Sequence, residues 1–123
     1  MNGGNAAPIR VLVLDDERSI RLLCRVNLEL DGHEVVEAAS LAEARDALAG
    51  GGVDVVVLDL HLRGERSDEL VAECRARRPP VPVILVTGSI EAGGAQSLGA
   101  DAVLGKPFEI DDLRRAVRAL AAR

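Results

Sequence analysis

Aromatic side chains are almost absent from this chain. Among its 123 residues Phe108 is the single aromatic one, and neither Trp nor Tyr occurs. The hydrophobic core is therefore predicted to consist of Val, Leu, Ile and Ala. Long apolar runs are also missing: none approaches the roughly 20 residues that a membrane-spanning helix needs, so we expect no membrane insertion.

Cysteine and lysine are scarce as well. Cys24 and Cys74 each fall at an apolar helical spacing, so we interpret them as reduced core residues of a cytoplasmic protein, neither metal ligands nor a disulfide. Of the fifteen Lys and Arg residues, all but Lys106 are arginine. The net charge of −5 argues against direct binding to nucleic acid or to an anionic membrane surface.

The chain is long enough for one domain with a buried core. Residues 1–8 are rich in Gly, Asn and Ala and lack both the basic start and the apolar stretch of a signal peptide. We predict a disordered N-terminal tail over residues 1–8 and a single domain over residues 9–123.

Five segments have the composition of strands. Four are continuously apolar, which is typical of parallel strands covered on both faces; they span residues 11–14, 53–58, 83–86 and 102–104. A fifth segment, residues 34–38, is more polar and fits an edge strand.

Helical patterns separate these strands. The residues predicted to face the core are Ile20, Leu23, Cys24 and Leu28 in the first helix, Leu70, Val71 and Cys74 in the third, and Ile110, Leu113, Val117 and Leu120 in the last. Ser40 and Ser67 are predicted to cap the second and third helices. The fourth helix has only residues 90–98 available, with Gly93 and Gly94 in its middle, so we expect it to be short or irregular.

Alternation of strands and helices predicts an α/β fold with a parallel sheet and right-handed crossovers. The expected form is a doubly wound, flavodoxin-like sheet of five strands in the order 2-1-3-4-5, with helices on both faces. In such sheets ligands bind outside the carboxyl ends of the strands, at the switch point between strands 1 and 3.

Polar side chains follow four of the predicted strands at that edge. Asp15 and Asp16 follow the first strand, Asp59 the third, Thr87 the fourth and Lys106 the fifth. Three converging carboxylates repel one another, and hard oxygen ligands of this kind suit Mg²⁺. With a lysine and a threonine beside them, they are suited to holding a phosphoryl group that a carboxylate attacks. Capping roles for Asp16 and Thr87 and a solvated loop position for Asp59 explain each residue singly, but not all of them together.

Four motifs carry a resemblance to a known family. They are Val13-Leu14-Asp15-Asp16-Glu17, Val56-Val57-Leu58-Asp59-Leu60, Leu85-Val86-Thr87-Gly88 and Lys106-Pro107-Phe108. In this order and spacing, the chain from Ile9 to its C-terminus resembles a receiver domain of two-component response regulators.

The resemblance implies roles for individual residues. Asp15, Asp16, Asp59 and the backbone carbonyl of His61 would hold Mg²⁺, and Asp59 would accept a phosphoryl group from a phosphohistidine. Thr87 and Lys106 would contact the phosphoryl oxygens, and the bond from Lys106 to Pro107 would be cis. His61 and Ser89 would flank the path of an attacking water and tune how fast the phosphoryl group is lost; an exposed loop position is the alternative for His61.

The resemblance also implies partners. The phosphodonor would be a histidine kinase or a histidine phosphotransfer protein, and the output a downstream protein target. A weak homodimer would form through the fourth helix, the fifth strand and the fifth helix. Such a domain is not an enzyme with a separate substrate, because it catalyses only its own phosphorylation and dephosphorylation. No helix-turn-helix follows the fifth helix, so we expect it to act without an effector domain.

Three positions depart from the family pattern. Val103 stands where the family usually has an aromatic residue. The conformational change on phosphorylation is therefore either signalled in a different way or carried by shifts of strand and helix alone. Arg63 and Ser67 stand where Pro and Gly are usual. Arg63 either pairs with the acidic site when metal is absent or is a solvated residue of a flexible, charged loop.

Two rival functions remain open at this point. A haloacid-dehalogenase-like phosphatase also uses Asp, Thr, Lys and Mg²⁺, but it needs an Asp two residues after the nucleophile on the first strand, where this chain has Glu17. The second rival is a degenerate receiver that serves as a protein-interaction module. The departures at Val103 and Arg63 and the short fourth helix favour this second rival, and the complete set of Asp, Thr and Lys residues opposes it.

Overall fold

The computed structural model describes residues 8–88 and 99–122. The elements in this part of the chain are β1 (Arg10–Leu14), α1 (Arg18–Leu30), β2 (Glu34–Ala38), α2 (Leu41–Ala49), β3 (Val55–Asp59), β4 (His61–Leu62), β5 (Glu65–Arg66), α3 (Asp68–Ala76), β6 (Val83–Gly88), β7 (Ala102–Lys106) and α5 (Ile110–Ala121). The predicted fourth helix, Ser89 and the predicted tail except Pro8 lie outside the described residues.

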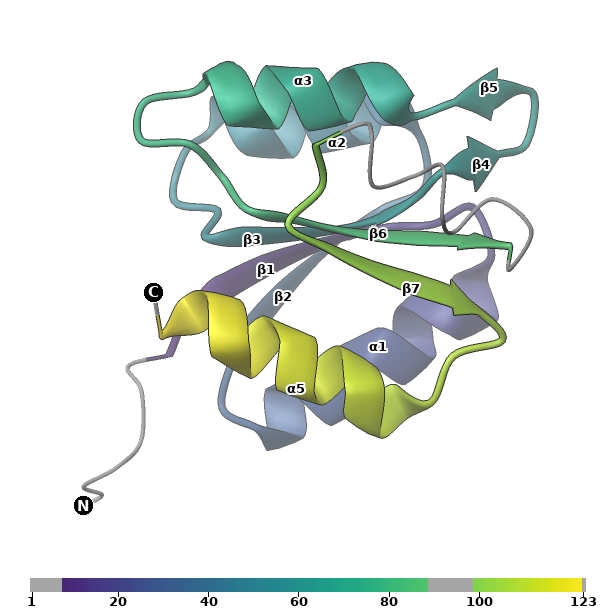
Figure 1. The fold of residues 1–123 in the computed structure, drawn as a ribbon, viewed down its shortest axis with the longest axis vertical. Coiled ribbons are helices and arrows are strands. Elements are labelled where there is room, and N and C mark those ends of the chain that lie inside the picture. The colour runs from purple at the N-terminus through teal and green to yellow at the C-terminus, as the bar shows by residue number, and fades with distance from the viewer. Residues whose placement is uncertain (1–7, 89–98, 123) are drawn as a thin grey trace.

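Five parallel strands form the central sheet in the order β2-β1-β3-β6-β7. This confirms the predicted order 2-1-3-4-5 and the doubly wound class. Figure 1 shows α1 and α5 on one face of the sheet and α2 and α3 on the other. Among the described residues, no helix is long and apolar enough to cross a membrane.

The core consists of two aliphatic layers, one on each face of the sheet. In β1 the side chains alternate: Leu12 and Leu14 pack with α2 and α3, whereas Val11 and Val13 pack with α1 and α5. Cys74 and Cys24 lie in these two layers as buried free thiols. Burial raises the pKa of Cys24 to about 12 and that of Cys74 to about 11. Both are therefore packing residues, as predicted.

The helix boundaries largely follow the predicted signals. Ser40 Oγ accepts a hydrogen bond from the Glu43 N–H at 3.2 Å, which is the predicted cap of α2. In α1, however, Leu23 is 44% exposed, so its predicted place in the core is wrong. Cys24 and Leu28 are the buried residues of this helix and Ile20 packs, partly buried, against the same layer, whereas Leu23 lies one residue too far around the helix.

Two short strands were not predicted. β4 and β5 pair as an antiparallel hairpin with His61 opposite Arg66 and Leu62 opposite Glu65. The prediction here was a flexible loop. Two-residue strands are too short to produce a periodic pattern, so composition alone described this segment as charged loop.

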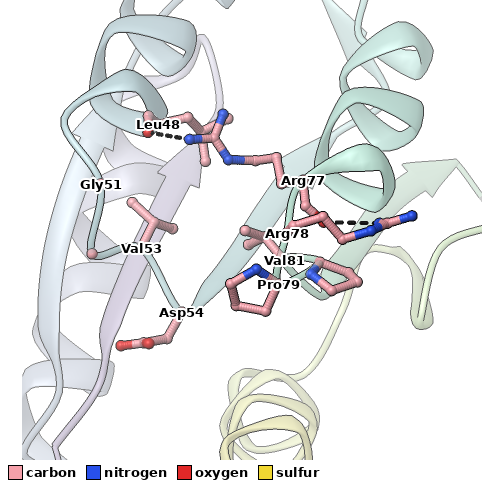
Figure 2. A pocket seen from close by; sticks show the side chains of 10 residues that line it. Leu48, Gly51, Val53, Asp54, Arg77, Arg78, Pro79 and Val81 are labelled. Carbon is pink, nitrogen blue, oxygen red and sulfur yellow. Dashed lines mark hydrogen bonds between the residues drawn. The ribbon is translucent and has the colours of Figure 1, made fainter.

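Two pockets of the described structure open at the amino ends of the strands. The pocket in Figure 2 has a volume of about 520 Å³ and an apolar wall that includes Pro79, Pro80 and Val81. Arg77 lines it as well, but its guanidinium donates to the Leu48 carbonyl oxygen at 2.7 Å. The strand-end Asp, Thr and Lys residues lie at the opposite edge of the sheet.

Candidate functional site: an acidic cluster at the carboxyl edge of the sheet

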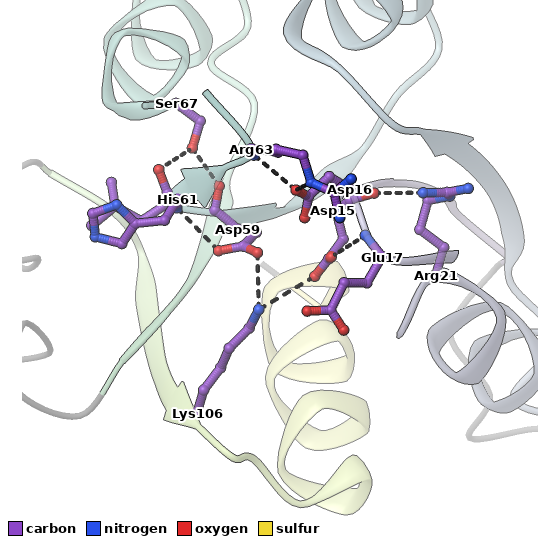
Figure 3. Close-up of polar contacts among 10 residues, drawn as sticks. Asp15, Asp16, Glu17, Arg21, Asp59, His61, Arg63, Ser67 and Lys106 are labelled. Carbon is purple, nitrogen blue, oxygen red and sulfur yellow. Dashed lines mark hydrogen bonds and ion pairs between the residues drawn. The ribbon is translucent and has the colours of Figure 1, made fainter. Parts of the chain in front are cut away.

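The parallel register brings the predicted strand ends together. Leu14 of β1 is paired with Leu58 of β3, so Asp15 and Asp59 follow on neighbouring strands. Thr87 lies in β6 and is paired with Gly105 of β7, directly before Lys106. Figure 3 shows the Lys106 ammonium pointing toward the carboxylates of Asp59 and Asp15.

Three carboxylates meet at this edge. One oxygen from each of Asp15, Asp16 and Asp59 lies within 4.8 Å of the other two. Asp15 and Asp59 are buried, whereas Asp16 is half-buried. Carboxylate oxygens at a partly exposed sheet edge fit Mg²⁺. This ion keeps several of its waters and is usually bound through one or two protein carboxylates.

Main-chain amides bind these carboxylates. The Glu17 N–H donates to Asp15 Oδ1 at 2.9 Å, and the His61 N–H donates to Asp59 Oδ1 at 3.1 Å. Burial is the main cause that raises the pKa of Asp15, and the nearby charges of Asp59 and Asp16 raise it further. The Glu17 amide and the Lys106 charge act in the opposite direction.

Lys106 contacts two of the three carboxylates. Its Nζ lies 2.9 Å from Asp59 Oδ2 and 3.7 Å from Asp15 Oδ2. Burial, the largest influence, lowers the pKa of Lys106, but the hydrogen bond and charge of Asp59, with the charge of Asp15, outweigh it, so the net shift is upward. Lys106 is therefore a fixed cation beside these carboxylates.

Thr87 presents a buried hydroxyl. Its side chain is 1% exposed, and Oγ1 has no hydrogen-bond partner in the described structure. An unsatisfied buried hydroxyl costs free energy and is uncommon in folded proteins. This donor fits an oxygen-rich group such as a phosphoryl group beside the acidic cluster.

Ser67 has a different role from the predicted helix cap. It is fully buried and makes no capping hydrogen bond to α3. Its hydroxyl bonds the Asp59 carbonyl oxygen instead, and lies 3.2 Å from that of Leu60. The only sequence signal for this contact was the departure from the usual glycine.

Arg63 combines both of its predicted alternatives. Its side chain is 89% exposed, with Nε 3.9 Å from Asp16 Oδ2, so the guanidinium is largely solvated. Its main-chain N–H, however, donates to the same oxygen at 2.7 Å. The sequence did not indicate this contact, because any residue except proline supplies an N–H.

The remaining predicted positions lie around the site. Lys106 and Pro107 are joined by a cis peptide bond, as the resemblance implied. Val103 is half-buried and packs against the core layer that includes α2 and α3. His61 is exposed beside Asp59; its predicted roles as a carbonyl ligand and as a modulator stay predictions.

Fold and site together define a class: a flavodoxin-like domain with an acidic cluster, a lysine and a buried threonine at the switch point of its sheet. The family model described as the response regulator receiver domain matches residues 11–118. The chain belongs to this family, whose members are signalling modules of two-component systems that bind Mg²⁺ at an acidic pocket.

Named relatives agree with this assignment. The chain is 33% identical over 119 residues to the response regulator MprA of a Mycobacterium species, covering 94% of this chain and 52% of the relative. It is 36% identical over 124 residues to the transcriptional regulatory protein TcrA of Mycobacterium tuberculosis, covering 98% and 49%. The chain thus spans about half the length of these relatives, so the expectation that it acts without an effector domain stays a prediction.

Solved structures show the same fold. The response regulator TrrA of Thermotoga maritima, in complex with Mg²⁺ and BeF, matches with a TM-score of 0.81 and 33% identity, covering 91% of this chain and 98% of that one. The chemotaxis response regulator CheY4 of Vibrio cholerae also matches with a TM-score of 0.81, at 27% identity, covering 93% and 99%.

Proposed function

We propose that this receiver domain accepts a phosphoryl group on Asp59 and switches a partner-binding surface in response. The observation that carries the proposal is the meeting of Asp59, Lys106 and Thr87 at one sheet edge. Asp59 contacts the ammonium at 2.9 Å, and the Thr87 hydroxyl is buried without a partner in the described structure.

Each residue has a distinct part in the proposed transfer. A carboxylate oxygen of Asp59 attacks the phosphorus of a phosphohistidine, the P–N bond breaks, and the imidazole leaves with the bonding electron pair. Lys106 and Thr87 hold the phosphoryl oxygens through an ammonium and a hydroxyl. The His61 amide, which donates to Asp59 Oδ1, keeps the acceptor carboxylate oriented.

Asp15, Asp16 and Asp59 would hold Mg²⁺, and the His61 carbonyl is proposed as a further ligand. When bound, the ion supplies positive charge to the transferring phosphoryl group. The structural relative TrrA is described in complex with Mg²⁺ and BeF, which supports testing the same pair of reagents on this chain.

The exposed surface of α1, the helix that follows Asp15 and Asp16, supports the proposal that the phosphodonor is a protein. Leu22, Leu23, Val26 and Leu30 of α1 are the exposed large hydrophobic residues of the described structure, each at least 44% exposed. Exposed apolar patches of this kind mark protein-interaction sites. We propose that a histidine kinase or histidine phosphotransfer protein docks on α1 in the cytoplasm. Dimerisation through β7, α5 and the predicted fourth helix stays a prediction.

One experiment tests the proposed function. The protein is incubated with Mg²⁺ and acetyl phosphate or beryllofluoride, and the adduct is detected by mass or by NMR shifts. We expect an adduct with the wild type and with Asp46→Asn, which alters an exposed carboxylate of α2, and none with Asp59→Asn. Absence of any adduct with either reagent would instead favour a degenerate receiver that acts as a protein-interaction module.

A further inference from the structure

The β4–β5 hairpin brings one main-chain donor onto the acidic cluster. We propose that Arg63 weakens Mg²⁺ binding, because its main-chain N–H engages the Asp16 carboxylate that the cation also needs. The inference rests on the proposed function, since it assumes that Mg²⁺ binds at Asp15, Asp16 and Asp59. It concerns a residue of this chain that lies at a departure from the family pattern.

The Arg63 contact differs from the other amide contacts of the cluster. The Glu17 and His61 amides bind carboxylates two residues away in the chain. The Arg63 amide crosses 47 residues of sequence to Asp16 Oδ2, at 2.7 Å. It therefore links the segment after β3 to the segment after β1, and it holds the carboxylate that is least buried of the three.

The hairpin holds this amide in place. Ser67, just after β5, is fully buried and bonds the Asp59 carbonyl oxygen. Glu65 in β5 accepts a hydrogen bond from the Leu41 N–H, at the start of α2, with a distance of 3.3 Å. The hairpin that carries the Arg63 N–H is therefore fixed by two hydrogen bonds, one at Glu65 within β5 and one at Ser67 just after β5.

The turn geometry leaves the Arg63 amide available to Asp16. Arg63 and Gly64 are the two residues between the paired positions Leu62 and Glu65. Gly64 has a φ of 80°, and every positive φ among the described residues belongs to a glycine. This is the sign pattern of a type II turn, in which proline is favoured at the first central position. Proline there would keep the turn and remove the N–H.

Two effects of Arg63 on the cation can be separated. The N–H shares the negative charge of Asp16 Oδ2 through a charge-assisted hydrogen bond. The guanidinium adds repulsion toward a divalent cation, but at 89% exposure solvent and salt screen it strongly. The main-chain donor is therefore the dominant influence, and its effect persists at high salt.

The test compares Mg²⁺ affinity in three forms of the full chain. Wild type, Arg63→Ala and Arg63→Pro are titrated with Mg²⁺ by calorimetry or NMR at low and high salt, and urea unfolding shows that each is folded. We expect a dissociation constant on the order of tenfold lower for Arg63→Pro, as the loss of one hydrogen bond to a charged group implies. Arg63→Ala keeps the N–H, so we expect a change of about twofold that disappears at high salt.

The outcomes distinguish this inference from the proposed function. Equal affinities for wild type and Arg63→Pro, or weaker binding by the proline variant, would overturn the inference and leave the proposed function standing. No Mg²⁺ binding by any form would overturn both. A second measurement needs no variant: amide exchange at Arg63 in the wild type should become faster on addition of Mg²⁺, and unchanged protection would refute the competition even if Arg63→Pro fails to fold.

Discussion

Lys106 places one compact positive charge between two carboxylates. Its Nζ is 2.9 Å from Asp59 Oδ2 and 3.7 Å from Asp15 Oδ2, and its side chain is 30% exposed. An ammonium is a small charge on a flexible stem, whereas a guanidinium is a wide planar fork. This geometry gives a reason for the single lysine in a chain whose other basic residues are arginine.

Lys106→Arg should therefore keep the fold but impair the phosphorylation response. The guanidinium retains the charge near Asp59, but its wide planar fork replaces a compact ammonium that can approach a phosphoryl oxygen as a point charge. We expect Mg²⁺ titrations to resemble those of the wild type, and the yield of beryllofluoride adduct to fall about tenfold or more, as loss of one positioned charged contact implies. A normal adduct yield in Lys106→Arg would mean that lysine is not specifically needed.

The Ser67 hydroxyl donates a hydrogen bond to the main-chain carbonyl oxygen of Asp59, the proposed phosphoacceptor. Ser67→Ala should lower the free energy of unfolding by about 1–2 kcal/mol, because the buried Asp59 carbonyl loses its hydroxyl donor. Urea unfolding measures this change, and Ser19→Ala, at an exposed position of α1, is the matched control with an expected change below about 0.5 kcal/mol. Equal stabilities of the two variants would contradict a structural role for the Ser67 hydroxyl.

At the scale of elements, α1 combines a buried and an exposed apolar face. Leu22, Val26 and Leu30 recur every four residues and form one exposed stripe. Replacing Leu22 and Val26 together by serine should reduce phosphoryl transfer from a histidine phosphodonor protein by about tenfold or more, as loss of apolar interface anchors does. Transfer from acetyl phosphate should be unchanged, because so small a donor needs no docking surface.

Rates of transfer from both donors test this prediction, with Arg115→Ser on the exposed part of α5 as the control. Equal losses with protein and small-molecule donors would indicate damage to the site instead of to a docking surface.

An ion pair between Asp31, which follows the last residue of α1, and Arg114 in the first half of α5 makes stability depend on pH. Arg114 Nη2 lies 2.6 Å from Asp31 Oδ1, and Nε lies 3.0 Å from Oδ2. The hydrogen bond from Arg114 is the main cause that lowers the pKa of Asp31, and the charges of Arg118 and His33 lower it further. Burial of His33 in turn lowers the pKa of that imidazole.

A lowered pKa in the folded state means that the Asp31 contribution is fully present above the pKa of unfolded aspartate and is lost as the pH falls through the folded value. Asp31→Asn should therefore be less stable than wild type by about 1 kcal/mol at neutral pH. The difference should shrink as the pH falls below the ordinary pKa of aspartate and through the lowered folded value. Urea unfolding of both proteins across this range measures it, and a difference that is constant with pH would show that ionisation of Asp31 is not the cause.

The elements differ in how far the sequence predicts them. Strands and helices with sustained apolar patterns were predicted, and β2 matches its predicted range of residues 34–38. β6 and β7 extend two residues beyond their predicted ends, so that Thr87 and Lys106 lie inside strands. The β4–β5 hairpin was missed because its strands of two residues have no period, and Ser67 was misassigned because a buried serine and a helix cap look alike in sequence.

At the scale of the whole molecule, one sequence pattern predicts both the topology and the main site residues. Apolar runs that end at or close to an Asp, Thr or Lys predicted both a parallel sheet and the edge at which five residues meet: Asp15, Asp16, Asp59, Thr87 and Lys106. The contacts of Ser67 and of the Arg63 amide depend on how the hairpin folds back over that edge. No pattern within either segment contains that information, which is why they required the structure.

The concentration of carboxylates at one edge also leads to a prediction for global stability. The chain has a net charge of −5, and three carboxylate oxygens lie within 4.8 Å of one another. A cation that binds the folded state stabilises it by mass action, which amounts to about 1.4 kcal/mol at ten times its dissociation constant. Mg²⁺ should therefore raise the unfolding temperature by about 5 °C under those conditions.

Asp16→Asn separates site binding from general screening of the negative charge. In this variant the metal-free protein should be at least as stable as wild type, because the cluster loses one repulsive charge, and the increase caused by Mg²⁺ should disappear. Asp46→Asn removes an equal charge from an exposed position of α2 and should keep the full increase. Calorimetric scans with MgCl₂, matched in ionic strength by NaCl, measure these shifts. An equal Mg²⁺ effect in Asp16→Asn would mean that the ion acts by screening the whole molecule and not by binding at the strand ends.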